Sequence, residues 1–96
     1  MKPSTLLEKN REQIKQIILK HNVLNPRVFG SVLNGIDTEL SDLDILVDPT
    51  STTSLFDIGA IRLELKEILH IEVDIVTPNA LPDSFRTLVL AQAKPI

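Results

Sequence analysis

The sequence predicts an α/β fold in which helical segments alternate with short strands along 96 residues. Two observations support this fold class. Apolar residues recur at helical spacing in three stretches, and short runs rich in β-branched residues lie between these stretches. The expected order of elements is α-β-(short α)-β-α-β-α. Because three strands alone bury little surface, we expect a small three-stranded mixed sheet with helices covering one face.

The length and composition are those of one small globular domain spanning residues 1–96. Apolar residues make up 43% of the chain and charged residues 24%, as in ordinary folded proteins. The net charge of −3 argues against a sequence-independent grip on nucleic acid, and three aromatic residues, all Phe, are too few for a base-stacking platform. We therefore expect no direct nucleic-acid binding. The absence of Cys excludes a disulfide framework and a thiolate zinc site.

The first twenty residues, MKPSTLLEKNREQIKQIILK, are too charged for the apolar core of a signal peptide. No apolar run elsewhere approaches the length of a membrane span. The absence of Cys is compatible with a reducing compartment. We therefore expect a cytoplasmic protein that does not bind membranes.

The first half of the chain predicts a helix, a strand, a short helical turn and a second strand. Residues 5–21 carry a helical apolar stripe, and Thr5 with Glu8 forms a capping-box pattern at its start. An Asn-Pro pair then breaks the helix, and Val28-Phe29 predicts a short strand. After a polar loop, DLDILV at residues 42–47 predicts the next strand, which an Asp-Pro pair ends.

The second half predicts a helix, a strand and a final helix. Ser54 with Asp57 makes a second capping signal ahead of apolar residues at helical spacing. The clearest strand is HIEVDIVT, from His70 to Thr77, because it alternates strictly and is rich in β-branched residues. Residues 81–93 predict the last helix. Three aromatic side chains are expected in the core: Phe29, Phe56 and Phe85.

Strand alternation places three carboxylates on one face of the predicted sheet. In DLDILV the apolar residues point to one face, while Asp42 and Asp44 point to the other. The same alternation in HIEVDIV separates Asp74 from the apolar row of that strand. If both apolar rows face the helices, all three Asp residues share the opposite, open face. Glu72 falls on that face too, and we interpret it as a solvated strand carboxylate.

These carboxylates predict a metal site. Two unit charges 4 Å apart repel by roughly 1 kcal/mol in water and by about 4 kcal/mol at an effective dielectric near 20. No stretch rich in Lys or Arg lies beside the three Asp residues in the sequence. A hard divalent cation suits such oxygen ligands, and Mg²⁺ held by a few carboxylates and by substrate phosphates fits best. Two magnesium ions about 3.5–4 Å apart would clamp the attacking and leaving oxygens of a displacement at phosphorus.

A Gly-Ser pair supplies a second half of this site. Gly30 ends the first strand and Ser31 opens the helical turn, so backbone N–H groups point out of the corner between them. Glycine lets an anion approach the backbone closely, and the Ser31 hydroxyl adds a donor. The sequence therefore predicts a phosphate-binding corner and a metal-binding strand on one hairpin.

The motifs resemble a known signature. FGSVLNGIDTELSDLDILV is similar to that of the DNA polymerase β-like nucleotidyltransferase superfamily: Gly-Ser, a spacer, Asp-x-Asp, and a third Asp on a later strand, here in EVDIV. Each piece alone is weak, but Gly-Ser followed at a fixed spacing by Asp-x-Asp arises by accident in only about one sequence in a thousand. Within the superfamily the chain resembles, over nearly its whole length, the minimal nucleotidyltransferases, antitoxins of HEPN-domain toxins. The resemblance implies the nucleotidyltransferase fold.

The resemblance also implies an activity and roles for the site residues. A nucleoside monophosphate would pass from a nucleoside triphosphate, usually ATP, to a hydroxyl of a partner protein, and pyrophosphate would leave. By motif position Gly30 and Ser31 would hold the triphosphate, Asp42 and Asp44 would ligate both metal ions, and Asp74 would ligate the catalytic metal and act as the candidate base. In these families the acceptor is a Tyr of the HEPN-type toxin. This chain has no Tyr, so it cannot modify a tyrosine of its own.

One position departs from the family pattern. Many relatives carry Arg just before the glycine that follows the Gly-Ser turn, whereas this chain has Asn34, which donates a hydrogen bond without a charge. Arg27, Arg62 and Arg86 are candidates to compensate. Two alternatives therefore stay open: an inactive antitoxin that neutralises its partner by binding, and a structural interaction domain, for which three aligned Asp residues have no explanation. The sequence leaves open the nucleotide, the acceptor residue, the number of units added and the oligomeric state.

Overall fold

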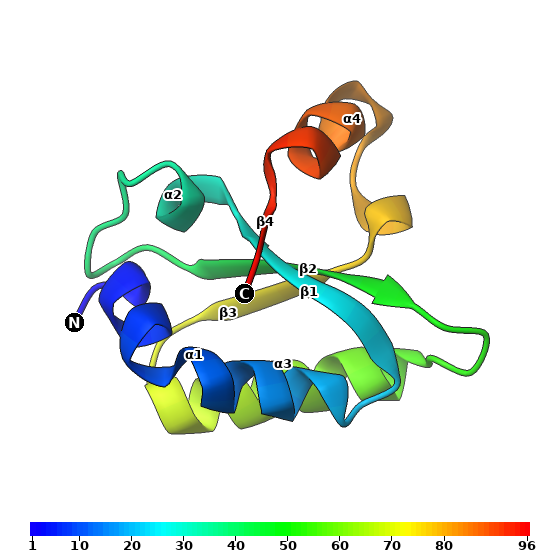
Figure 1. The fold of residues 1–96 in the computed structure, drawn as a ribbon, viewed down its shortest axis with the longest axis horizontal. Helices are drawn as coiled ribbons and strands as arrows, with labels where there is room; N and C mark the ends of the chain where they lie inside the picture. Colours follow the sequence, from blue (N-terminus) through cyan, green and yellow to red (C-terminus); the bar gives the residue numbers. More distant parts are fainter.

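A mixed sheet with helices on both sides forms the centre of the molecule (Figure 1). The computed structural model describes residues 1–96. In chain order the elements are α1 (Pro3–Leu19), β1 (Val23–Phe29), α2 (Gly30–Leu33), β2 (Leu43–Pro49), α3 (Leu55–Leu69), β3 (Val73–Val76), the 3-10 helix η1 (Pro78–Ala80), α4 (Asp83–Gln92) and β4 (Lys94–Pro95). None of the helices combines the length and the apolar character needed to cross a bilayer.

The sheet has four strands in the order β3-β2-β1-β4, so the expectation of three strands is wrong in this detail. β1 runs antiparallel to β2 and β4, whereas β2 and β3 are parallel, which confirms a mixed sheet. The additional strand is β4, where Lys94 and Pro95 pair with Val28 and Arg27. Two residues give no alternation to detect, and a Pro is tolerated there because β4 lies at the edge of the sheet.

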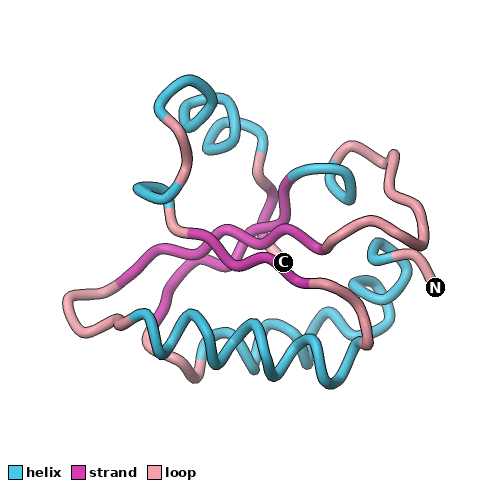
Figure 2. The backbone as a smooth tube through the Cα atoms, turned by 180° about the vertical axis from the view of Figure 1, so that it is seen from behind, coloured by secondary structure: helices cyan, strands magenta, loops and turns pink.

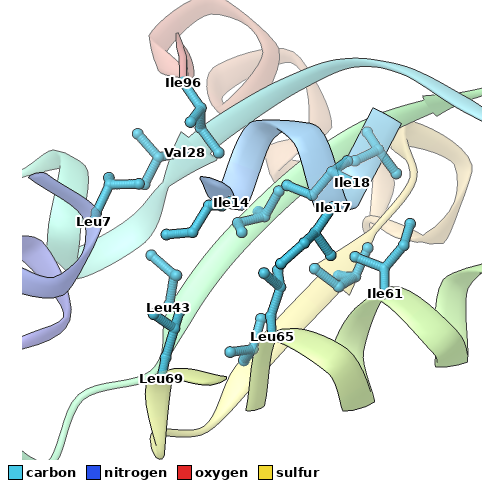
Figure 3. Close-up of a cluster of buried hydrophobic side chains, with 14 of the residues drawn as sticks. Leu7, Ile14, Ile17, Ile18, Val28, Leu43, Ile61, Leu65, Leu69 and Ile96 are labelled. Carbon is cyan, nitrogen blue, oxygen red and sulfur yellow. The ribbon is translucent and has the colours of Figure 1, made fainter. Parts of the chain in front are cut away.

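Two helices cover one face of the sheet, as predicted. α1 and α3 lie side by side beneath the strands in the ribbon of Figure 1 and in the backbone tube of Figure 2. Their apolar stripes pack against the apolar rows of the strands, and Figure 3 shows this core. Its buried members are Leu7, Ile14, Ile17, Ile18, Val23, Val28, Val32, Leu43, Ile45, Val47, Ile61, Leu65, Leu69, Val73, Ile75 and Ile96.

The opposite face is open only in part. Leu46 alternates with the core residues of β2, yet it is buried, and so is Leu81; neither belongs to the main core. The segment from β3 through η1 crosses this face, where η1 contacts β2. Beyond it, α4 stands away from the sheet and buries no residue (Figure 1).

The predicted aromatic core does not form. Phe56 is 90% exposed at the start of α3, Phe85 is exposed on α4, and Phe29 is half-buried. Phe85 lies on a helix, as predicted, but α4 buries none of its residues. The core is therefore aliphatic.

Several element ends differ from the expected ones. α1 begins at Pro3 without a side-chain cap, so the capping box predicted at Thr5 is wrong; Pro suits the first turn because its missing N–H would be unpaired there anyway. The capping box at Ser54 and Asp57 is confirmed in both directions. His70 does not begin a strand: it caps the C-terminus of α3 in the left-handed conformation, and β3 starts at Val73.

β1 is longer than predicted, because it begins at Val23. The Asn25-Pro26 pair, predicted as a break, lies inside the strand, where the register with β2 shifts between Leu24 and Arg27. Asn25 has a positive φ of 51°, the left-handed conformation that one type of β-bulge uses, and the backbone of Pro26 donates no hydrogen bond. β2 begins one residue later than predicted, so Asp42 precedes the strand.

Candidate active site

The strand register brings together the two predicted halves of the site. In the antiparallel pair β1 and β2, Phe29 lies opposite Asp44, so Gly30 follows directly beside this carboxylate. In the parallel pair β2 and β3, Asp44 is the register partner of Asp74. Neighbouring strands lie about 4.8 Å apart. Gly30, directly after β1, therefore forms a row with Asp44 of β2 and Asp74 of β3, and strand alternation predicted the shared face of the two Asp residues.

Gly30 is needed at the corner for two reasons. Its φ is +74°, in the left-handed region that costs other residues roughly 1–2 kcal/mol. A Cβ added to Gly30 would also overlap the Oδ2 atom of Asp44. The backbone at the start of α2 and the Asp44 carboxylate thus share one small space, which only glycine leaves open.

The ionised form of Asp44 is unfavourable in the folded protein. Burial raises its pKa to about 6, and the negative charges of Asp74 and Asp42 add to the shift. Asp44 is half-buried, while Asp42 and Asp74 are exposed. The ordinary pKa of this carboxyl is 3.8, so its ionised form is disfavoured by the folded chain alone. The site has an excess of negative charge that a bound cation would relieve.

The donor set fits a magnesium ion. None of the ion pairs in the molecule includes Asp42, Asp44 or Asp74, so no side chain of the protein neutralises them. No group of three or more His, Cys, Asp or Glu side chains is already drawn together in the geometry of a metal site. Mg²⁺ keeps several waters and takes part of its ligands from substrate phosphates, so it does not need a closed protein cage.

Ser31 and Asn34 lie at the two ends of α2. Ser31 is half-buried, and its backbone carbonyl accepts from the N–H of Ile36 at 3.1 Å. Asn34 is exposed, and its Nδ2 donates to the Gly30 carbonyl at 3.1 Å. This bond closes the turn that holds Gly30, so Asn34 has a structural role in the phosphate corner.

The three candidate arginines have other partners. Arg27 pairs with Asp48, Arg62 with Glu72 and Arg86 with Asp83. Arg62 also donates to the Val73 carbonyl, and Arg86 donates to the carbonyls of Pro78 and Leu81. The structure therefore gives none of them the role of compensating for the uncharged Asn34.

Glu72 does not join the carboxylate row. It precedes β3 and pairs with Lys66 and Arg62 of α3, and the hydrogen bond from Lys66 lowers its pKa. Alternation assigned it to the open face because the predicted strand began at His70. Glu72 is exposed, as expected for a solvated carboxylate.

The loop between the two halves contains a buried acid that the sequence reading missed. Asp37 is 7% exposed and accepts a hydrogen bond from the backbone N–H of Ser4 at 2.9 Å. Burial opposes its ionisation, but the hydrogen bonds from Ser4 and the charge of Lys2 outweigh this and lower its pKa. Asp37 thus fastens the loop to the start of α1. An Asp in the polar run GIDTELS gives no sign of this partner 33 residues away.

The chain belongs to the nucleotidyltransferase family that includes polymerase β. The family model described as "Polymerase beta, Nucleotidyltransferase" matches residues 12–96, which include the whole carboxylate row. The matched residues contain the motifs in the order Gly-Ser, Asp-x-Asp and a lone Asp. The protein is therefore a nucleotidyltransferase.

Its relatives are small proteins of similar length. It is 36% identical over 83 residues to "Putative protein adenylyltransferase MJ0435" of Methanocaldococcus jannaschii, covering 86% of this chain and 89% of the relative. A second protein of that organism, "Putative protein adenylyltransferase MJ0126", is 31% identical over 83% of this chain and 79% of its own length.

Solved structures share the fold. A "putative minimal nucleotidyltransferase" superimposes with a TM-score of 0.86 at 35% identity, covering 97% of this chain and 95% of the other. A toxin-antitoxin complex crystallised with AMP-PNP contains a chain with a TM-score of 0.75 at 23% identity, covering 90% and 71%. The second likeness shows the fold alone.

Proposed function

We propose that this nucleotidyltransferase transfers AMP from ATP to a hydroxyl of a partner protein, with Mg²⁺ as its cofactor. The observation that carries the proposal is the row formed by Gly30, directly after β1, with Asp44 of β2 and Asp74 of β3. No ion pair of the chain neutralises these carboxylates. A row of this kind suits a ligand that brings its own cations and its own phosphates. The relatives' printed names, protein adenylyltransferases, support the reaction class.

Each residue of the row has a role in the proposed reaction. The backbone at Gly30 and the Ser31 hydroxyl would bind the triphosphate. Asp42, Asp44 and Asp74 would hold up to two Mg²⁺ ions, which supply positive charge to the phosphates when bound. The acceptor oxygen forms a bond to the α-phosphorus, the bond from that phosphorus to pyrophosphate breaks, and Asp74 accepts the proton of the acceptor hydroxyl.

We further propose that the acceptor belongs to a toxin of the HEPN type and that this chain is its antitoxin. Asp42 and Asp74 are exposed and Asp44 is half-buried, so a separate protein can bring its hydroxyl to the carboxylate row. Chains of similar fold occur in toxin-antitoxin complexes, one of them with AMP-PNP. This chain has no Tyr, so the tyrosine modified by such an activity would belong to the partner.

The second candidate is an antitoxin that neutralises the toxin by binding, without transfer. The position of Asn34 favours it, because the side chain is uncharged and is used to close its own turn. The two functions differ in what Asp44 does: transfer requires it, whereas masking of a partner does not.

The test is transfer of label from ATP carrying ³²P at the α-phosphate to the cognate toxin, in the presence of Mg²⁺. We expect label on the toxin with the wild-type protein and with Glu72→Gln, which removes a nearby carboxylate outside the row. Asp44→Asn should reduce the transfer rate by at least about a hundredfold, since losing a metal ligand also removes the charge stabilisation that the metal ion would give the transition state.

Each result separates the candidates. Transfer that survives Asp44→Asn contradicts the assignment of the site. Wild-type protein that transfers no label yet still neutralises the toxin, with Asp44→Asn equally protective, supports the binding antitoxin instead.

A further inference from the structure

The loop of residues 34–42 joins the two halves of the candidate active site and exposes two large apolar side chains. Leu40 is 94% exposed, more than any other large apolar residue of the chain, and Ile36 is 71% exposed. Apolar residues scattered singly over a surface are ordinary. These two lie in the short stretch between the phosphate corner and β2, so their position decides whether they have a use.

Both residues are connected to the site through the backbone. The N–H of Ile36 donates to the carbonyl of Ser31 at 3.1 Å, which fixes the start of the loop against the phosphate corner. Leu40 is two residues before Asp42, so the Cα atoms of these two residues are at most about 7 Å apart. A protein that covers Ile36 and Leu40 therefore lies directly beside the candidate metal ligands.

The loop is held in one conformation by its own hydrogen bonds. The N–H of Ser41 donates to the carbonyl of Thr38 at 3.1 Å and closes a β-turn in which Leu40 is the third residue. The Ser41 hydroxyl accepts from the N–H of Thr38 at 2.8 Å, and the Thr38 hydroxyl accepts from the N–H of Leu40 at 3.2 Å. The buried Asp37 also binds the N–H of Ser4. Because the loop is already ordered, covering Leu40 would cost little conformational entropy.

The charge of the loop indicates the kind of surface that would cover it. The loop contains acidic residues but neither Lys nor Arg. Glu39 and Asp42 are exposed, whereas the charge of the buried Asp37 has Lys2 near it. The one ion pair of Glu39 is with the N-terminal amine, at 3.9 Å. Apolar side chains flanked by exposed acids complement a protein surface that has an apolar centre and a basic rim.

We infer that the loop of residues 34–42 is the docking surface for the acceptor protein. Ile36 and Leu40 pack against an apolar patch of that protein, and Glu39 faces basic residues at the rim of the patch. This inference rests on the proposed function, which requires a protein to bring its hydroxyl to the carboxylate row. It assigns affinity for the partner to the loop and the chemistry to the carboxylates, so the two can be changed separately.

The experiment compares binding of the acceptor with binding of the nucleotide. Transfer of label from α-³²P-ATP is measured over a range of concentrations of the cognate HEPN-type toxin, and calorimetry measures the affinity for a Mg²⁺-loaded, non-hydrolysable ATP analogue. We expect Leu40→Ala to raise the KM for the toxin by about tenfold, because a leucine side chain that is buried on binding contributes to affinity. The rate at saturating toxin and the affinity for the analogue should match wild type.

Two further variants sharpen the test. Leu55→Ala is the matched control, because Leu55 is 88% exposed but lies at the start of α3, beyond the other end of β2 (Figure 1). It should match wild type in every measurement. Glu39→Lys reverses the charge beside Leu40 and should raise the KM for the toxin more at low salt than at high salt.

Each contrary result overturns the inference in a distinguishable way. An unchanged KM in Leu40→Ala, with transfer by the wild-type protein intact, removes the loop from the docking surface and leaves the proposed function standing. A weaker affinity of Leu40→Ala for the ATP analogue assigns Leu40 to the nucleotide site instead. A smaller oligomer of unliganded Leu40→Ala than of wild type assigns the loop to a second copy of this chain. Wild-type protein that transfers no label overturns the proposed function and the inference with it.

Discussion

The two faces of β2 differ in what they contribute to the molecule. On the helix side Leu43, Ile45 and Val47 are each fully buried in the core. On the other side Asp44 is only half-buried, yet it has a pKa raised to about 6 beside Asp74 and Asp42. The seven residues of β2 thus include an apolar row that stabilises the fold and a carboxylate, Asp44, whose charge lowers its stability. A carboxylate row that lowers stability is expected to serve binding rather than folding.

The largest effect is expected on the helix-covered face. Leu65→Ala, at a fully buried position of α3, should lower the free energy of unfolding by about 2–5 kcal/mol through lost burial and the cavity left behind. Urea denaturation measures this change. Leu63→Ala is the matched control on the same helix, since Leu63 is 58% exposed, and it should change stability by less than about 0.5 kcal/mol. Similar losses for both variants would contradict the placement of the core.

The next effect is expected where the two halves of the site meet. Gly30→Ala should cost roughly 1–2 kcal/mol for its positive φ and should also displace the Asp44 carboxylate, so nucleotide binding falls as well. Gly35→Ala is the control, because Gly35 has a similar φ of +70° but nothing within 4 Å of an added Cβ. It should lose stability in urea and keep its nucleotide affinity. Loss of affinity in both variants would show that backbone strain, not the contact with Asp44, matters.

On the open face, a substitution of Asp44 is expected to raise the free energy of unfolding by a smaller amount. The pKa of Asp44 is raised by folding, from 3.8 to about 6, so ionisation of this group lowers stability as the pH rises through this window. Asp44→Asn should therefore stabilise the unliganded protein at pH 7 by about 1–2 kcal/mol, after discounting for partial exposure.

The same argument predicts how that gain depends on pH. Below about pH 3 Asp44 is largely protonated in both the folded and the unfolded protein, so the advantage of Asp44→Asn should disappear. Urea denaturation of both proteins at about pH 7 and about pH 3 checks this. A variant that is less stable than wild type at pH 7 would mean that the Asp44 charge has a stabilising partner in the chain.

The smallest effect is expected at Glu72, two residues from Asp74 in sequence. Glu72→Gln removes exposed ion pairs with Lys66 and Arg62, and such pairs contribute little. Its urea midpoint and its rate of AMP transfer should both match wild type. A large loss of transfer would place Glu72 in the carboxylate row, where strand alternation alone had put it.

Alternation predicted the relative placement of two carboxylates correctly, because it is a short-range property of strands. It placed Asp44 and Asp74 on one face, and the register makes them direct neighbours. It failed at the strand ends: Glu72 left the row because His70 continues the end of α3 in the left-handed conformation. A period-two pattern has no information about where pairing starts.

Features set by long-range packing could not be predicted. Phe56 and Phe85 were expected in the core from their apolar character, but the sheet has room only for the stripes of α1 and α3. Asp37 resembled any loop acid, and its burial depends on the first turn of α1. β4 is two residues long and becomes a strand only because β1 has an edge free beside it.

The most direct test of the carboxylate row is the effect of Mg²⁺ on the affinity for a non-hydrolysable ATP analogue, measured for Asp42→Asn, Asp44→Asn and Asp74→Asn beside Glu72→Gln. If the three Asp residues hold the metal ions, each of these three variants loses most of the gain in affinity that Mg²⁺ gives the wild-type protein, and Glu72→Gln keeps it. An unchanged magnesium effect in all three Asp variants would contradict the account.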